Sequence, residues 1–134
     1  MWKHGGHQEF SFGRVSDAYA ARLIAETSLD LRGFSRIMAT RGVRHVRNSH
    51  GDADREQAQG QVAVRPSDFR LIPEIADKGT IRLIGTVGRR KPVRLEHVAT
   101  IDGLNYVLLE TVGLNSKRIE LLTMRIEQLG KRSV

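Results

Sequence analysis

The chain has 134 residues and a net charge of +7 at neutral pH, carried by 17 arginines and 5 lysines against 15 acidic residues. This length predicts one domain with its own core, and the absence of cysteine excludes disulfides, thiolate metal sites and cysteine nucleophiles. Apolar runs fall well short of the roughly 20 residues that a membrane helix needs, so we expect a soluble protein without a membrane partner, suited to the cytoplasm.

The excess of arginine over lysine indicates an anionic partner. A guanidinium group binds phosphate through two parallel hydrogen bonds and stacks on bases, which favours a nucleic acid. A GC-rich genome would also enrich arginine without any binding role. Because aromatic residues make up only 5% of the chain, we do not expect an open platform of stacked rings for single-stranded RNA.

The first part of the chain predicts a helix followed by a short extended segment. Residues 1–13 are polar and contain glycine, which indicates a flexible N-terminal segment. Ser16 suits the N-cap of a helix that ends near Thr27, with alanine and leucine at helical spacing. Residues 34–38 alternate in character, which predicts an edge strand or an extended approach to the next helix.

Residues 41–51, with the sequence RGVRHVRNSHG, gather histidines and arginines into one short segment. Thr40 suits the N-cap of a helix here, and Gly51 suits the left-handed position just after its last turn. Helical spacing places His50 on the valine face, toward whatever the helix packs on, and His45 on the far side.

Two interpretations of His50 stay open. Free carbonyl groups at a helix C-terminus stabilise the imidazolium, and beside arginines it would suit a phosphate-cleaving site as a general acid. A lone histidine at this position is also a common helix cap. A zinc site is disfavoured, because His45 and His50 do not have the i, i+4 spacing of zinc-binding pairs on helices.

The second part of the chain changes from helical to alternating periodicity. Residues 51–61 are polar and acidic, which predicts a loop or a solvated helical turn. Pro66 begins a helix that ends by Lys78. Beyond it, the alternating segments predict four strands, at 80–87, 93–101, 105–112 and 117–127.

Turn signals join these strands into a meander. Asp102 and Gly103 both tolerate positive φ, as a type I′ hairpin requires, and residues 88–91 form a basic hairpin tip. We therefore predict an α+β domain over residues 14–128, with N-terminal helices packed on one face of a mainly antiparallel four-stranded sheet, and a tail at 129–134.

Alternation along the sheet suggests a set of reactive side chains. Glu110 shares a face with Tyr106, and Thr123 shares one with Arg125. A carboxylate, a hydroxyl and arginines that converge beside the His50 helix could cleave RNA without a metal, by attack of the 2′-OH on the adjacent phosphate. Each residue also has an ordinary interpretation: Glu110 as the ion-pair partner of an arginine, Thr123 as a strand former, and Tyr106 as an aromatic at the core edge. His97 is expected to be structural.

Five segments of the chain resemble one known family in their order and in their amino-acid sequence. They are VSDAYAARLIAETSLDLRGF, RHVRNSHG, GQVAVRPSDFRLIPEIADK, NYVLLETV and KRIELLTM. Together they resemble the phage-encoded barnase/EndoU/colicin/RelE-like nuclease domains, which often form C-terminal toxin domains of phage head-morphogenesis (MuF-type) and polyvalent proteins. The similarity spans roughly residues 15–127. It implies an α+β ribonuclease fold and metal-independent cleavage of RNA.

The residues and the resemblance together give two sets of candidate side chains. The catalytic set is His45, His50, Glu110 and Thr123. The set that binds phosphate or RNA is Arg44, Arg47, Tyr106, Lys117, Arg118 and Arg125. No metal or other cofactor is implied. A helix that ends near Asn48 would let both histidines reach one cleft.

Two positions depart from the pattern of the resembled family. Leu122 stands where a lysine commonly precedes the threonine, and Asn105 replaces a second tyrosine. If that lysine neutralises the phosphate in related domains, Arg118 or Arg125 would have to do so here.

Three functions follow as alternatives. The first is an endoribonuclease that acts on RNA such as tRNA, in the cytoplasm or after delivery by a phage particle or toxin system. The second is a basic RNA-binding domain without catalysis. The third is a protein-interaction domain of a phage polypeptide, with an acidic partner such as an antitoxin or immunity protein.

Overall fold

The computed structural model describes residues 8–85 and 92–128. Its helices are α1 (Asp17–Thr27), α2 (Thr40–His50), α3 (Ala53–Ala58), the 3₁₀ helix η1 (Pro66–Leu71) and α4 (Ile72–Lys78). Its strands are β1 (Glu9–Arg14), β2 (Ser35–Ala39), β3 (Gln61–Val62), β4 (Arg82–Ile84), β5 (Val93–Ile101), β6 (Leu104–Gly113) and β7 (Arg118–Gln128). The predicted basic tip at 88–91 and the predicted tail at 129–134 lie outside the described residues.

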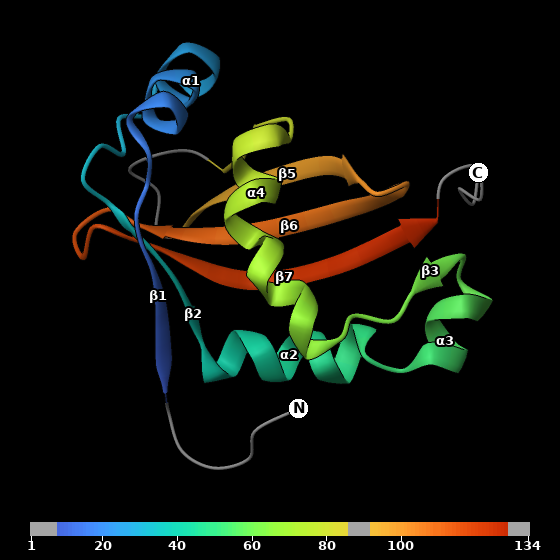
Figure 1. Ribbon diagram of the computed structural model, residues 1–134. Helices are drawn as coiled ribbons and strands as arrows, with labels where there is room; N and C mark the ends of the chain where they lie inside the picture. The colour runs from blue at the N-terminus through green and yellow to red at the C-terminus, as the bar shows by residue number, and fades with distance from the viewer. Residues whose placement is uncertain (1–7, 86–91, 129–134) are drawn as a thin grey trace.

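One seven-stranded sheet organises the fold (Figure 1). Six strands follow the order β1-β2-β7-β6-β5-β4, and β3 pairs with the remaining part of the β7 edge. The pairing of β2 with β7 is parallel, and the other pairs are antiparallel. The predicted α+β class is therefore confirmed, although β1, β2 and β3 extend the four strands that the sequence predicted.

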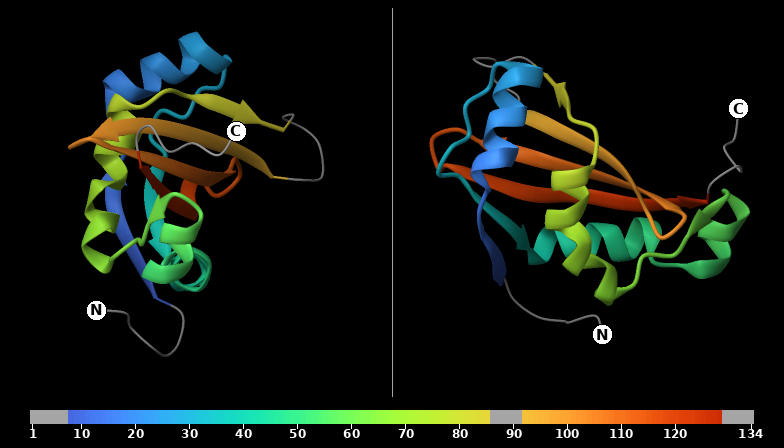
Figure 2. Two further views of the ribbon diagram at one scale, coloured as in Figure 1. Left: turned by 90° about the vertical axis from the view of Figure 1, so that its right-hand side faces the viewer. Right: turned by 45° about the horizontal axis from the view of Figure 1, so that its top comes forward.

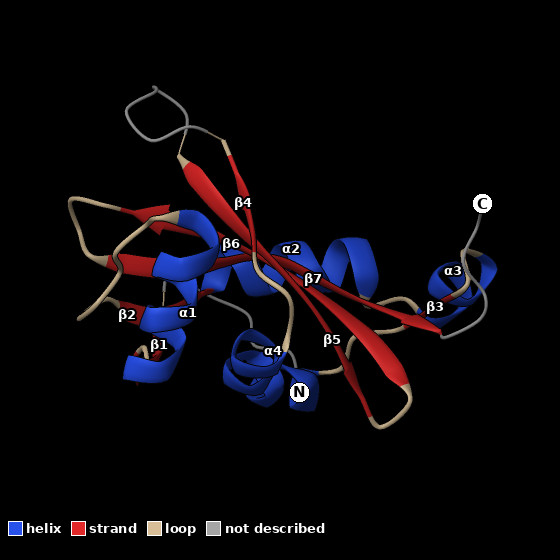
Figure 3. Ribbon diagram, turned by 90° about the horizontal axis from the view of Figure 1, so that it is seen from above, coloured by secondary structure: helices blue, strands red, loops and turns tan. Residues whose placement is uncertain are grey.

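Helices cover one face of this sheet. In Figures 1 and 2, α1 and α4 lie across the same side of β5, β6 and β7, and α2 runs along the β7 edge. In Figure 3, from above, α1 and α4 lie on one side of the strands, and α2 passes beneath β7. The core forms where β5, β6 and β7 turn alternate side chains toward the helices, and Leu95, Leu108 and Met124 are fully buried there.

The β5–β6 hairpin forms as predicted. Asp102 and Gly103 have φ values of 51° and 79°, the two positive values of a type I′ turn. This turn fixes the long register from Val93↔Val112 to Ile101↔Leu104. The register then decides which side chains of β6 face the helices.

The N-terminal region departs from the prediction. Residues 1–13 were expected to be flexible, but Glu9–Arg14 forms β1 and pairs with β2. Phe10 and Phe12 alternate along this strand, a period that the short, polar segment obscured. As a result, β2 lies between β1 and β7 and is not an edge strand.

Helix α2 also differs at both ends from the sequence prediction. It begins at Thr40, so Thr40 is not its N-cap, and the Thr40 hydroxyl accepts a hydrogen bond from the Gln8 backbone N–H at 2.7 Å. It continues to His50 and does not end near Asn48. Gly51 has a φ of −98°, so the left-handed ending is absent there.

A glycine lets α2 lie directly against β7. A Cβ atom at Gly42 would lie only 2.5 Å from the backbone oxygen of Leu121. One turn later, Val46 is fully buried in the core. This close approach places the two sides of α2 on different surfaces of the molecule, which determines where its arginines and histidines lie.

None of the helices in the described residues is long and apolar enough to cross a membrane.

Candidate functional site

The sheet separates residues that the sequence predicted to meet. The register of β6 and β7 pairs Leu109 with Thr123 and Glu110 with Leu121, so Leu122 is an extra residue that bulges from β7. Residues paired in this way share a face of the sheet. Glu110 therefore points to the helix-covered side and Thr123 to the uncovered side. The prediction that they converge is wrong.

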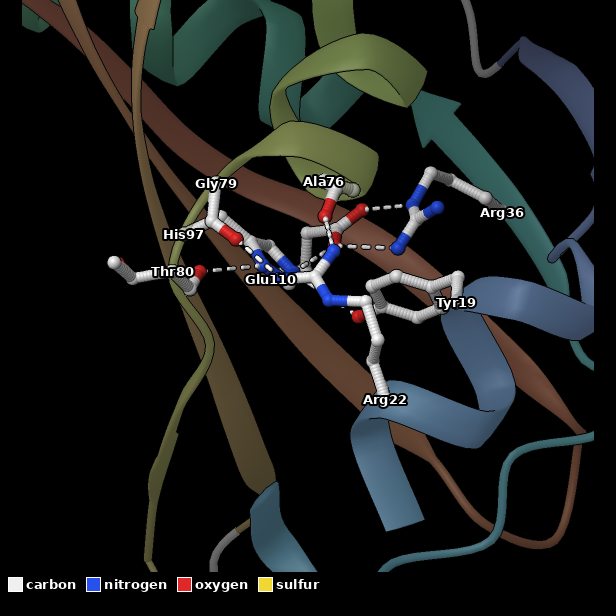
Figure 4. Close-up of polar contacts among 8 residues, drawn as sticks. All are labelled: Tyr19, Arg22, Arg36, Ala76, Gly79, Thr80, His97 and Glu110. Atoms are coloured by element: carbon white, nitrogen blue, oxygen red, sulfur yellow. Dashed lines mark hydrogen bonds and ion pairs between the residues drawn. The ribbon is translucent and has the colours of Figure 1, made fainter. Parts of the chain in front are cut away.

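Glu110 belongs to a buried polar cluster with Arg36, His97 and Tyr19 (Figure 4). Its carboxylate accepts hydrogen bonds from Arg36 Nε at 2.8 Å and from Arg36 Nη2 at 3.2 Å, and His97 Nε2 lies 3.3 Å from its Oε1 atom. The Tyr19 hydroxyl lies 3.1 Å from His97 Nε2, and the Arg36 guanidinium lies 4.7 Å from the centre of the Tyr19 ring. An RNA strand cannot reach this carboxylate in the closed fold.

The charges of this cluster stabilise one another. Burial by itself would raise the pKa of Glu110, but the Arg36 charge and the contact with His97 lower that pKa from 4.5 to about 2. His97 Nδ1 lies 3.2 Å from the Thr80 carbonyl oxygen, which can only accept, so Nδ1 carries a proton. Burial raises the pKa of the Tyr19 hydroxyl. These groups join α1, β2, β5 and β6, which gives the cluster a structural role.

Arg22 closes this cluster from the α1 side (Figure 4). Its Nη2 donates to the Gly79 carbonyl at 2.6 Å, and its Nη1 donates to the Asp77 carbonyl. These carbonyls belong to the end of α4, where helix carbonyl groups lack partners and favour a cation. Arg22 thus fixes α1 to α4 above the Glu110 carboxylate.

His50 is engaged in a second local pair. Its Nδ1 lies 2.9 Å from Glu56 Oε1, and the Glu56 side chain is fully buried, whereas that of His50 is 20% exposed. Glu56 comes from the acidic segment that the sequence left as a loop or solvated turn. The contact holds α3 against the end of α2, and His45 lines a groove that His50 does not line, so the two histidines do not share a cleft.

On the uncovered face of the sheet, α2 forms a groove with β6 and β7, which we call the α2–β7 groove. It has a volume of about 360 Å³. It is lined by Arg41, Gly42, His45, Thr111, Glu120, Leu121 and Leu122. His45 is exposed at this groove. The groove therefore offers an imidazole, a carboxylate, a guanidinium and a hydroxyl to one bound molecule.

Arg41 holds the groove carboxylate in place. Its Nε and Nη2 donate to the two Glu120 oxygens at 2.5 and 2.6 Å, and the Glu120 side chain stays 16% exposed. Such a two-point ion pair fixes the orientation of a carboxylate. Sequence reasoning missed Arg41, Thr111 and Glu120. Along β6, the period of two places Thr111 on the face opposite Glu110, but it shows neither which face is open nor how Glu120 of β7 is aligned with β6.

A comparison with family models decides what kind of domain this is. The model described as phage-Barnase-EndoU-ColicinE5/D-RelE like nuclease3 matches residues 13–133. The chain belongs to this family. No curated protein and no solved structure matches the chain. The family resemblance inferred from the sequence is thus confirmed, and the α2–β7 groove is the candidate site of a domain from a phage nuclease family.

The predicted RNA-binding residues of this nuclease domain lie in several places. Tyr106 is buried in the core, where burial raises the pKa of its hydroxyl. Arg118 forms an ion pair with Glu9 of β1, and Lys117 is exposed in the turn before β7. Tyr106 is thus not available to RNA in this state, and the others do not form one group.

Three arginines of the predicted set lie closer to the open surfaces. Arg125 Nε lies 3.0 Å from Glu127, on the uncovered face that also carries Thr123. Arg44 and Arg47 line a second groove on the other side of α2. The helix therefore presents cations to two grooves. Across residues 8–85 and 92–128, no three histidine, aspartate or glutamate side chains lie close enough together to hold a metal ion.

Replacing Thr123 by valine is expected to stabilise this nuclease domain by about 1 kcal/mol. The Thr123 hydroxyl oxygen is buried and has no hydrogen-bond partner among the described residues. Burying a polar group without a partner costs free energy, and valine removes this cost. Urea unfolding measures the change. Thr100→Val is the matched control, because the Thr100 hydroxyl donates to Asn105 at 2.6 Å and its loss should not stabilise. If Thr123→Val were less stable than the wild type, the Thr123 hydroxyl would have a hydrogen-bond partner after all, and the explanation would be wrong.

Proposed function

We propose that this domain is a metal-independent endoribonuclease that cleaves RNA in the α2–β7 groove. One observation carries the proposal: His45 and Glu120 line the same groove on the uncovered face of the sheet. A general acid and a general base can act on one phosphodiester only when both reach it, and this groove offers that pair in a chain of a nuclease family.

The proposed reaction is an internal transfer within RNA. The Glu120 carboxylate takes the proton of the 2′-OH, and the 2′ oxygen forms a bond to the adjacent phosphorus. The bond from phosphorus to the 5′ oxygen breaks, and protonated His45 gives its proton to that leaving oxygen. The products are a 2′,3′-cyclic phosphate and a free 5′-hydroxyl, so no bound water or metal is required by the balance of the step.

Neighbouring groups would stabilise the developing charge. Arg41 holds Glu120 and lies at the groove itself, so its guanidinium can also approach the phosphorane oxygens. Thr111 supplies a hydroxyl to the groove. Thr123 and Arg125 lie on the same uncovered face, but the hydroxyl of Thr123 is buried. Within the catalytic set inferred from sequence, His45 is therefore the residue that this proposal retains at the reacting atoms.

Incubation with RNA in a chelator tests the proposal. Total RNA and tRNA are treated with the protein in excess EDTA, and the product ends are analysed for 2′,3′-cyclic phosphate. A parallel RNA with 2′-O-methyl groups at every position should remain intact, because it lacks the attacking hydroxyl. Cleavage of the methylated RNA, or products with 3′-hydroxyl ends, would rule out the proposed step.

One observation favours a second candidate function, an RNA-binding domain without catalysis. Leu122, which stands at the position where the resembled domains commonly have lysine, lines the α2–β7 groove itself. The groove in which phosphate would bind therefore lacks the cation that the resembled domains have at this position. RNA binding without any product over hours would support this alternative.

Replacing Leu122 by lysine is expected to raise kcat/KM for RNA cleavage by about tenfold. A lysine in the groove adds one charge-assisted contact to the phosphate as its negative charge grows, and such a contact contributes roughly 1.5–3 kcal/mol. Steady-state kinetics on a labelled RNA measure the change. Leu122→Met is the neutral control of similar length. If Leu122→Lys tightens RNA binding but yields no product, the catalytic proposal fails.

A further inference from the structure

A second groove lies on the opposite side of α2, and we call it the β1–α2 groove. Its volume is about 320 Å³, and β1, β2, α2 and η1 all contribute to it. Apolar walls come from Phe10, Met38, Val43 and Pro66. Phe10 is 54% exposed, although it is a large aromatic residue on a strand. The exposed wall of an otherwise apolar groove is a place where a flat apolar group can bind.

Cations stand at the same groove. Arg44 and Arg47, one turn apart on α2, both line it. The Arg47 side chain forms no ion pair or hydrogen bond with another described residue, while its backbone carbonyl accepts from the Gly51 N–H. Glu9 is the acidic residue of the lining, and it is ion-paired with Arg118. The groove thus combines apolar walls with a guanidinium whose charge is not neutralised.

We propose that the β1–α2 groove binds one nucleotide of the RNA substrate, at a position away from the cleaved bond. The inference rests on the proposed function, because it assigns a further part of the same RNA to this groove. A nucleobase can pack on Phe10 and Val43, and the phosphate attached to it can bind Arg47. The volume is that of a single small ligand, which limits the occupant to one nucleotide.

The position of α2 connects this groove with the proposed cleavage groove. Arg41 and His45 line one groove, and Arg44 and Arg47 line the other. The two are therefore separated by about one helix diameter, roughly 10–12 Å. A single RNA strand that crosses α2 would contact both, whereas a dinucleotide bound for cleavage would occupy only the α2–β7 groove. Longer substrates should consequently bind better.

The test measures binding and cleavage separately. Binding is followed by fluorescence anisotropy of a labelled 2′-O-methyl RNA hexamer, which resists the proposed chemistry. Cleavage is followed as kcat/KM for an unmodified hexamer and a dinucleotide. The variants are Arg47→Gln, which removes the cation, and Phe10→Ala, which removes the exposed wall. Arg32→Gln is the control, because Arg32 is exposed, pairs with Asp30 and lines neither groove.

Each groove variant is expected to bind the hexamer about tenfold more weakly and to lose most of the preference in kcat/KM for the hexamer over the dinucleotide. Arg47→Gln should also lower the salt dependence of binding by about one phosphate contact. Arg32→Gln should match the wild type. Thermal melts of each variant exclude unfolding as the cause of any loss.

Other outcomes overturn the inference. Unchanged hexamer binding in both variants would exclude the nucleotide. The nucleotide would also be excluded if Arg47→Gln weakened the binding of a labelled acidic peptide of alternating glutamate and tryptophan but did not weaken the binding of the hexamer. Failure of the proposed function is distinguishable: the wild type would then bind the hexamer through this groove but release no cyclic phosphate from the unmodified RNA.

Discussion

Replacing His45 by alanine is expected to lower the rate of RNA cleavage by about 10²–10⁴-fold, the contribution of one general acid or base. The side chain is exposed at the α2–β7 groove and is not part of the core, so the substitution should leave the free energy of unfolding within about 0.5 kcal/mol of the wild type. Single-turnover cleavage of a labelled RNA gives the rate, and urea unfolding gives the stability. Glu120→Gln should reduce the rate to a similar degree.

His50→Ala separates this site from the one inferred from sequence. His50 pairs with the fully buried Glu56, so its loss leaves a buried carboxylate without that partner and is expected to cost about 1–3 kcal/mol of stability. The His50→Ala molecules that remain folded should cleave RNA at the wild-type rate. If His50→Ala were inactive and fully stable while His45→Ala were active, the α2–β7 groove would not be the catalytic site.

Local signals gave the elements of this fold because they act through neighbouring residues. Ser16 accepts a hydrogen bond from the Tyr19 backbone N–H, as its position before an apolar helix predicted. Asp102 and Gly103 adopt the positive φ values that their residue types favour. Such preferences depend little on the rest of the chain, which is why the order of helices and strands could be predicted.

The site could not be predicted in the same way, because it depends on which face of the sheet the helices cover. A strict period of two keeps Leu121 with Thr123, but the bulge at Leu122 moves Leu121 to the covered face beside Glu110. A bulge has no reliable sequence signal. Consequently Glu110, although correctly placed on its strand, was assigned to a cleft that it does not face.

Long-range pairing explains the other differences. β2 pairs with β7 in parallel although the elements from α2 to β6 lie between them in the sequence, and β1 pairs with the other edge of β2. The ion pairs of Arg36 with Glu110 and of Arg41 with Glu120 likewise join residues more than 70 positions apart. The abundance of arginine indicated a polyanion, but it could not show which arginines are engaged within the protein.

Replacing Glu110 by glutamine is expected to destabilise the protein by about 3–5 kcal/mol, because it leaves the buried Arg36 guanidinium without a counter-charge. Domains of this size are usually stable by only about 5–15 kcal/mol, so a large part of the folded population should be lost on heating. Urea unfolding measures the loss. The double variant Arg36→Met with Glu110→Leu is the control: it removes both charges and should recover much of the stability, whereas a double variant as unstable as Glu110→Gln would contradict this explanation.

The same carboxylate should make the protein sensitive to acid. Arg36 and His97 lower the folded pKa of Glu110 to about 2, while its ordinary value is 4.5, so the unfolded state binds a proton at a higher pH than the folded state. The stability that Glu110 contributes is therefore fully present above about pH 4.5 and is lost progressively as the pH falls toward 2. Unfolding free energies measured across this window should fall steeply for the wild type. The slope should be smaller in the double variant, because it has no carboxylate at position 110 to protonate, and an equal slope in both proteins would show that other carboxylates cause the acid sensitivity.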